Sequence, residues 1–141
     1  KDVVGQVCLI HSLDRWNLAE EINKRGILQG IEVPVLLEIN IAGEEQKAGL
    51  KPGDIENFLE SAGQLTAIKI CGFMTVAPFF ENSEQTRPIF NELRRIKEHL
   101  SRKAYKNVEL RHLSMGMTND FEVAIEEGAT IVRIGSAFFN K

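Results

Sequence analysis

The chain has 141 residues, enough for one domain with a hydrophobic core, and we expect residues 1–141 to form a single domain. Its 43% hydrophobic and 26% charged residues are ordinary for a globular protein. A formal net charge of −3, without a basic run or a zinc-ligand spacing, argues against a nucleic-acid partner. No apolar stretch approaches the roughly 20 residues that cross a bilayer, so no membrane partner is expected.

Cys8 and Cys71 both lie in apolar, strand-like runs. We expect two buried, reduced thiols, as is typical of a cytosolic protein. No apolar segment of the kind found in secretory signals follows Lys1, and the expected location is therefore cytoplasmic.

The first third of the chain predicts a strand, a helix and a second strand. Apolar runs at 5–11 and 33–41 are typical of buried strands, and the second is nearly continuous, as in a parallel sheet covered on both faces. Apolar residues at helical spacing predict a helix over 16–27 between them. Ser12 or Asp14 is placed to cap the start of that helix.

The middle of the chain continues the alternation. Pro52 stands at a first-turn position and predicts a helix over 54–62. A third strand is expected at 67–76, and a long amphipathic helix at 83–100 follows it. Pro88 falls in the first turns of that helix, where proline is tolerated best.

The last third predicts a strand at 108–113, a helix at 118–127 and a fifth strand at 129–134. Thr118 is a natural N-cap for this helix and Gly128 a natural C-cap. The resulting βαβαβαβαβ order predicts an α/β fold with a parallel sheet. Five such strands fit either an open doubly wound sheet or the last five units of a (β/α)8 TIM barrel.

Two turns carry the candidate functional site, and we call them together the cradle. In segments 113–120 and 132–136, a strand runs into an expected helix start through a turn that contains glycine and a hydroxyl residue. Backbone N–H groups and helix starts in such turns bind phosphate. The alternative is that Ser114 and Thr118 only cap helices. The candidate binding residues are Ser114, Gly116, Met117, Thr118, Arg133, Gly135 and Ser136.

Arg133 lies inside the apolar run 131–134. A buried guanidinium must be paired or hydrogen-bonded, or it costs several kcal/mol. One interpretation is a structural salt bridge to a carboxylate such as Glu38; the other is contact with a bound ligand.

Other titratable residues are candidates for a chemical role. His11 and His112 end apolar strands and are placed to line a barrel mouth, although a purely structural role is the simpler interpretation. A nucleophilic pair with Ser114 is conceivable, but the chain has no GxSxG elbow. Lys47 and Lys69 look like ordinary surface lysines, because nothing in their surroundings predicts the lowered pKa of a nucleophilic lysine.

The chain closely resembles the pyridoxal-phosphate homeostasis proteins, which are single-domain relatives of the N-terminal barrel of alanine racemase. The LSMGM and VRIGS segments are the most specific part of this resemblance, and Asn140 departs from the glycine usual in the family. The matching segments occur in the family's order and are 11–15, 37–40, 43–49, 72–75, 113–121 and 132–139.

The resemblance implies that pyridoxal 5'-phosphate (PLP) is the cofactor, with its phosphate in the cradle and Arg133 at its pyridine nitrogen. The family's Schiff-base lysine lies near the end of the first barrel strand, and nothing in this chain matches that segment. The chain therefore looks like a C-terminal portion, a partial barrel without the anchoring lysine. The implied function is PLP buffering and delivery to apo PLP-dependent enzymes, without catalytic turnover.

An amino-acid racemase, or another TIM-barrel enzyme with a phosphorylated substrate, is the alternative. Racemases of this type also need a tyrosine from a second domain, and Tyr105, expected on the long helix, is badly placed for that role. A plain α/β interaction module is a third reading. An incomplete barrel would also expose the edge of the first strand near Val7, so the isolated piece is expected to self-associate.

Overall fold

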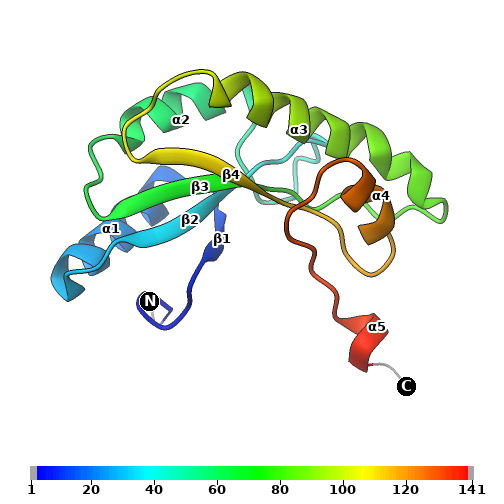
Figure 1. Cartoon of the computed structure of the whole chain (residues 1–141), viewed down its shortest axis with the longest axis horizontal. Helices are drawn as coiled ribbons and strands as arrows, with labels where there is room; N and C mark the ends of the chain where they lie inside the picture. Colours follow the sequence, from blue (N-terminus) through cyan, green and yellow to red (C-terminus); the bar gives the residue numbers. More distant parts are fainter. Residues whose placement is uncertain (1–2, 140–141) are drawn as a thin grey trace.

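The computed structural model describes residues 3–139, and Asn140 lies outside them. Four strands pair in parallel and in chain order, β1-β2-β3-β4, which confirms the predicted α/β fold with a parallel sheet (Figure 1). The strands are β1 (Ile10–Leu13), β2 (Val33–Glu38), β3 (Ile68–Met74) and β4 (Val108–Ser114).

Helices connect the strands as the sequence predicts. The two prolines lie where expected, Pro52 at the first residue of a 3-10 turn before α2 and Pro88 in the first turn of α3. The predicted cap of α1 is wrong: Arg15 is its N-cap, without a side-chain bond, and Ser12 belongs to β1. The helices are α1 (Trp16–Gln29), α2 (Ile55–Ala62), α3 (Arg87–Ser101), α4 (Phe121–Glu126) and α5 (Ser136–Phe139).

The first predicted strand is displaced along the chain. Residues 5–8 are exposed turns, and pairing with β2 begins only at Ile10, opposite Val35. Cys8 is therefore exposed rather than buried, whereas Cys71 is buried as expected; both are free thiols. The apolar pattern of 5–11 is misleading because no neighbouring strand reaches residues 5–8.

The fifth predicted strand, 129–134, does not form. Its pairing with β4 is reduced to one bridge, between Ile131 and Ser114. The Ile131 N–H donates to the Leu113 carbonyl at 3.2 Å, and the Met115 N–H donates to the Ile131 carbonyl at 3.1 Å. The segment keeps the direction of a parallel strand, but too few of its backbone groups are paired to make a ladder.

The helices pack on one face of the sheet, and Figure 1 shows α2 and α3 lying across it. Alternation along β2 places Val33, Val35 and Leu37 in the core beneath the helices and Leu36 on the other face. There Leu36 joins a second, smaller cluster of buried residues with Cys71 and Met74. Both faces of β2 are thus buried, as its continuous apolar sequence predicted, although the helices cover only one of them.

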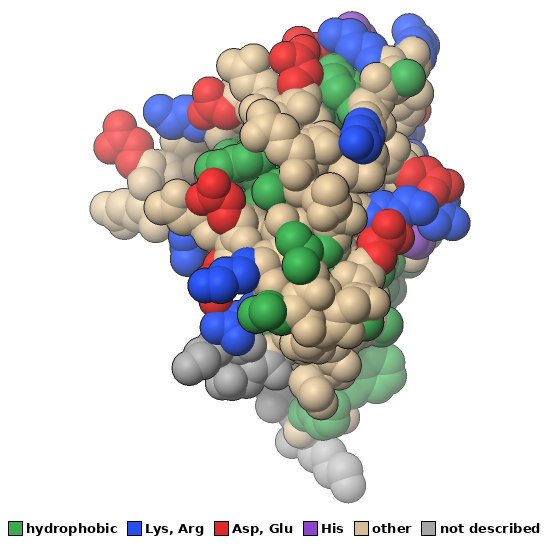
Figure 2. All heavy atoms as spheres, turned by 90° about the vertical axis from the view of Figure 1, so that its left-hand side faces the viewer, with side chains coloured by type: hydrophobic (Ala, Val, Ile, Leu, Met, Phe, Trp, Pro, Cys, Tyr) green, Lys and Arg blue, Asp and Glu red, His purple; other side chains and the backbone are tan. Residues whose placement is uncertain are grey.

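The edge of the sheet at the amino-terminal ends of the strands is charged. Lys69 of β3 pairs with Glu109 of β4 at 3.1 Å, and Arg111 contacts the same carboxylate at 3.2 Å. Figure 2 views this end of the molecule and shows charged side chains of both signs around scattered apolar ones. Within residues 3–139, no helix is both long enough and apolar enough to cross a membrane.

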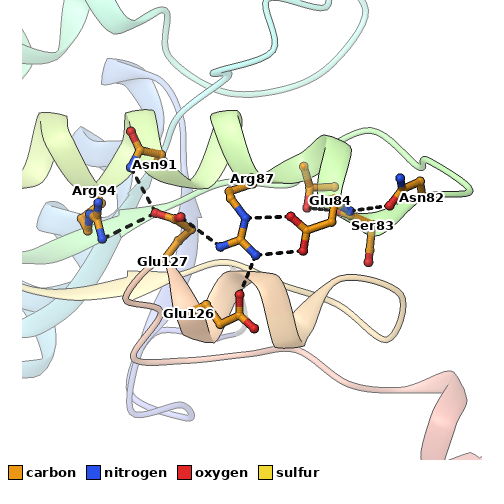
Figure 3. A network of polar contacts seen from close by, with 9 residues as sticks. Asn82, Ser83, Glu84, Arg87, Asn91, Arg94, Glu126 and Glu127 are labelled. Atoms are coloured by element: carbon orange, nitrogen blue, oxygen red, sulfur yellow. Dashed lines mark hydrogen bonds and ion pairs between the residues drawn. The ribbon is translucent and has the colours of Figure 1, made fainter.

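A charged network fixes α4 to α3 (Figure 3). Arg87 donates from Nε and Nη2 to the carboxylate of Glu84, at 2.8 Å each, and from Nη1 to Glu127 at 3.1 Å. The largely buried carboxylate of Glu127 also accepts from Asn91 at 3.1 Å and lies 3.5 Å from Arg94. Because Glu127 ends α4, these contacts hold the start of the segment that leads to Arg133.

Gly72 is required by the pairing of β3 with β4. Its φ is +152°, and a Cβ there would lie 2.0 Å from the carbonyl oxygen of His112. We expect Gly72→Ala to lower the free energy of unfolding by more than about 2 kcal/mol in urea denaturation. Gly53→Ala is the matched control, since a Cβ at Gly53 meets nothing within 4 Å. Equal stability of the two variants would contradict this reading.

The contacts of Glu127 predict that its contribution to the free energy of unfolding is lost in acid. The hydrogen bond from Asn91, together with Arg87 and Arg94, holds the pKa of Glu127 below its ordinary value of 4.5. The stabilisation is therefore complete above that value and is lost as pH falls through the folded-state pKa. In urea denaturation from pH 7 to pH 3, Glu127→Gln is expected to be less stable than the parent at pH 7, and the difference should shrink towards pH 3. A difference independent of pH would refute the assignment.

Candidate functional site

All seven predicted binding residues gather at and beyond the carboxyl end of β4. Hydrogen bonds join the two cradle segments: the Arg133 N–H donates to the Gly116 carbonyl at 2.9 Å, Arg133 Nη1 donates to the Ser114 hydroxyl at 2.8 Å, and the Ser136 hydroxyl donates to the Thr118 hydroxyl at 3.0 Å. The strand-to-loop turns predicted from the sequence therefore lie side by side.

Gly116 allows the first turn to pack closely. Its φ is +100°, and a Cβ would lie 2.6 Å from the Cβ of Ala124 in α4. Beside it, the Met117 N–H donates to the carboxylate of Asp120 at 2.7 Å, which holds the loop before α4. The half-exposed Met117 side chain lines a small pocket of about 180 Å³ with the 77–80 loop, so it forms a wall next to the cradle.

The cradle hydroxyls fall into two groups. Ser114 is fully buried, and its hydroxyl is committed to protein partners. Thr118 and Ser136 lie nearer the surface and contact each other. The prediction that Thr118 caps a helix is wrong, because Asp120 is the N-cap of α4. The C-cap of α4 is Glu127, one position before the predicted Gly128, and Gly128 follows it with φ +98°.

Arg133 binds the ends of two strands. Its Nη1 donates to the Ser114 hydroxyl at 2.8 Å, and its Nη2 donates to the Thr75 carbonyl at 2.9 Å. Among the described residues it forms no ion pair with Glu38, so the structural salt-bridge alternative is wrong. Burial lowers the pKa of Arg133, and the Glu38 carboxylate opposes that effect without contact.

Glu38 and His11 surround this guanidinium. Burial, and then the nearby Asp14 carboxylate, raise the pKa of Glu38, whereas the charge of Arg133 lowers it. His11 Nδ1 lies 2.9 Å from the Ser114 hydroxyl oxygen. Burial lowers the pKa of His11, and the charges of Arg133 and His112 act in the same direction.

The sequence interpretation missed the contribution of β3. Thr75 follows that strand and supplies the carbonyl that holds Arg133, while its own hydroxyl donates to the Ile39 carbonyl at 2.7 Å. The sequence favours a purely structural role for His11, yet His11 contacts Ser114, a predicted site residue. A usable signal existed, because the carboxyl ends of neighbouring parallel strands meet at one edge of a sheet.

The remaining candidates lie apart from the cradle or are paired elsewhere. Lys69 is paired with Glu109 at the opposite edge, and Lys47 lies 3.5 Å from Glu44 in an exposed loop. Tyr105 lies in the connection between α3 and β4, not on the helix as expected, and therefore also at the opposite edge. In the part of the chain that the structure describes, no group of three or more histidine, cysteine or acidic residues could hold a metal ion.

The geometry suits a small anion attached to a polar ring. The Thr118 and Ser136 hydroxyls face each other, and the first N–H groups of the α5 turn have no acceptor within that turn. Arg133, from the same pair of segments, is a fixed cation held by the Ser114 hydroxyl and the Thr75 carbonyl. These donors fit a phosphate, and the guanidinium fits an acceptor atom carried by the same ligand.

The chain is similar in sequence to pyridoxal phosphate homeostasis proteins. A pyridoxal phosphate homeostasis protein of Aquifex aeolicus is 50% identical over 141 residues, which are 100% of this chain and 61% of that protein. A protein of the same name from Bos taurus is 33% identical over 142 residues, covering 98% of this chain and 52% of that protein. The chain thus spans about half to three-fifths of the length of these relatives.

The chain is also similar to solved structures. PipY of Synechococcus elongatus with PLP bound superposes with a TM-score of 0.86 at 30% identity, covering 98% of this chain and 63% of that one. D-threonine aldolase from Filomicrobium marinum shares the fold, with a TM-score of 0.68 at 16% identity over 88% of this chain and 35% of that one. The family described as alanine racemase, N-terminal domain, matches residues 4–140. The chain therefore belongs to the alanine racemase N-terminal domain family.

Proposed function

We propose that this chain binds pyridoxal 5'-phosphate and serves to hold and deliver the cofactor. The observation that carries the proposal is the pairing of an exposed hydroxyl cradle, Thr118 with Ser136, and a half-buried guanidinium held only by neutral oxygens. The name of the Aquifex aeolicus relative and the PLP bound to PipY support it. All seven predicted residues, Ser114, Gly116, Met117, Thr118, Arg133, Gly135 and Ser136, are proposed to form the binding site.

Arg133 favours storage over catalysis. When bound, PLP supplies an electron sink whose strength depends on protonation of its pyridine nitrogen. Arginine stays protonated and can only donate, so at that nitrogen it would leave the ring unprotonated and the sink weak. A racemase would need a tyrosine near the cradle, and Tyr105 lies at the other edge of the sheet. We therefore propose binding without turnover, with apo PLP-dependent enzymes as recipients.

We further propose that residues 1–141 form one domain, part of a (β/α)8 barrel. A doubly wound sheet reverses its strand order, whereas these four strands follow chain order without reversal. Inward side chains also form layers, as in a barrel, with Leu36 and Cys71 beneath a polar layer that contains Glu38 and Ser114. The shorter length of the chain relative to its relatives agrees with further strands completing the barrel.

The hydroxyl cradle predicts a phosphate-dependent affinity. The double variant Thr118→Val, Ser136→Ala is expected to bind PLP at least about tenfold more weakly than the parent chain, since two hydrogen bonds are lost. Titration followed by the absorbance of PLP measures this. Thr66→Val, at an exposed turn away from the cradle, is the matched control and should bind like the parent. Equal affinities of the double variant and the parent would refute the cradle.

The lysines predict reversible rather than covalent binding. Lys47 and Lys69 are paired with carboxylates, and contact with Glu109 raises the pKa of Lys69, so neither is a ready nucleophile. After incubation with PLP and borohydride, intact-mass measurement is expected to find no stoichiometric adduct. Stoichiometric trapping on either lysine would overturn the view that the covalent anchor lies outside this chain.

The exposed edge of the sheet predicts self-association. Among residues 3–139, β1 pairs with β2 alone, so the backbone of Ile10–Leu13 presents unpaired groups along its other side. Light scattering on the isolated chain is expected to give a mass that rises with concentration to a dimer or more. A monodisperse monomer over the same concentrations would contradict the open-edge interpretation.

A further inference from the structure

The buried Ser114 hydroxyl lies between two nitrogen atoms that constrain its single proton. Arg133 Nη1 is 2.8 Å away, and His11 Nδ1 is 2.9 Å away. A guanidinium can only donate, so the Ser114 oxygen accepts from Arg133. The hydroxyl proton is then free to point at the other neighbour, His11.

The contact with Ser114 bears on the tautomer of His11. When the Ser114 proton points at Nδ1, Nδ1 accepts, and neutral His11 carries its proton on Nε2. Burial and two cationic or titratable neighbours lower the pKa of His11, which agrees with a neutral ring near pH 7. In that form, the hydrogen bonds run in one direction, from Arg133 to Ser114 and from Ser114 to His11.

We propose that His11 is a positioning residue that couples uptake of one proton to binding of an anionic ligand in the cradle. When Nδ1 gains a proton from solvent, it donates to the Ser114 oxygen, and the Ser114 O–H turns from His11 towards the bound anion. The same step adds a positive charge beside Arg133. Both changes favour an anion, and by linkage a bound anion favours protonated His11.

Charged groups on each neighbouring element bear on this equilibrium. Arg133, from the 129–134 segment, and His112, from β4, both oppose protonation of His11. Glu38 of β2 and Asp120, the N-cap of α4, are the acidic groups that act on Arg133, and Asp14 after β1 acts on Glu38. The inference rests on the proposed function only for the identity of the anion.

The first arm of the test needs no PLP. Long-range ¹H–¹⁵N NMR spectra of the full chain should show the Nε2–H form of His11 at pH 7.5. Ser114→Ala removes the donor to Nδ1, so the pKa of His11 is expected to rise in that variant. Inorganic phosphate should also raise that pKa in the parent chain. An Nδ1–H form, or a pKa unchanged in Ser114→Ala and with phosphate, would overturn the proposal.

The second arm measures PLP affinity against pH. His11→Asn keeps an oxygen acceptor on a shorter side chain but does not titrate. The ratio of the parent's affinity to that of His11→Asn should rise about fivefold or more from pH 7.5 to pH 5.5. Titration of the ligand phosphate cancels in this ratio. His99→Asn, at a histidine with a 65% exposed side chain, is the control and should follow the parent.

The two arms separate the two claims. A ratio that stays constant with pH, while PLP still binds, refutes the role of His11. Absence of PLP binding at every pH refutes the proposed function, and the phosphate and tautomer measurements then decide the role of His11 by themselves.

Discussion

The candidate site depends on one half-buried cation, Arg133, whose hydrogen-bond partners among the described residues are neutral. Arg133 reaches from a segment with almost no strand pairing of its own to the Ser114 hydroxyl and the Thr75 carbonyl, at the ends of two neighbouring strands. Without those acceptors, a half-buried guanidinium would carry a desolvation cost that nothing offsets. The contacts that stabilise the charge therefore also fix the approach of the second cradle segment to the first.

Two other interactions hold the 129–134 segment in place. The Glu127 carboxylate anchors its start to α3 through Arg87 and Asn91 (Figure 3), and the Arg133 N–H bonds to the Gly116 carbonyl. The 129–134 segment is thus held in place near its start and near its end, although it forms no regular strand. Binding geometry here comes from side-chain and loop contacts placed on a rigid sheet, an arrangement common in parallel α/β proteins.

The polarity of the sheet separates two kinds of charge. At the carboxyl edge, Arg133 contacts no carboxylate of residues 3–139, and Glu38 and Asp120 act on it without contact. At the amino edge, Lys69, Glu109 and Arg111 neutralise one another in close pairs. Exposed paired charges contribute little to stability, whereas a cation without a paired carboxylate keeps its charge for another partner. This difference is the reason for proposing the anion site at the carboxyl edge.

The sequence by itself determined most of the alternation of strands and helices and the parallel sheet, because hydrophobic period, proline and glycine signals are local. The seven cradle positions stay a prediction from the sequence. It also supplied the family resemblance through the 113–121 and 132–139 segments. Only the tertiary structure decided where pairing begins at Ile10, why 129–134 is not a strand, and which acceptors hold Arg133. Each of these depends on contacts between residues distant in sequence, such as His11 with Ser114, which no local pattern encodes.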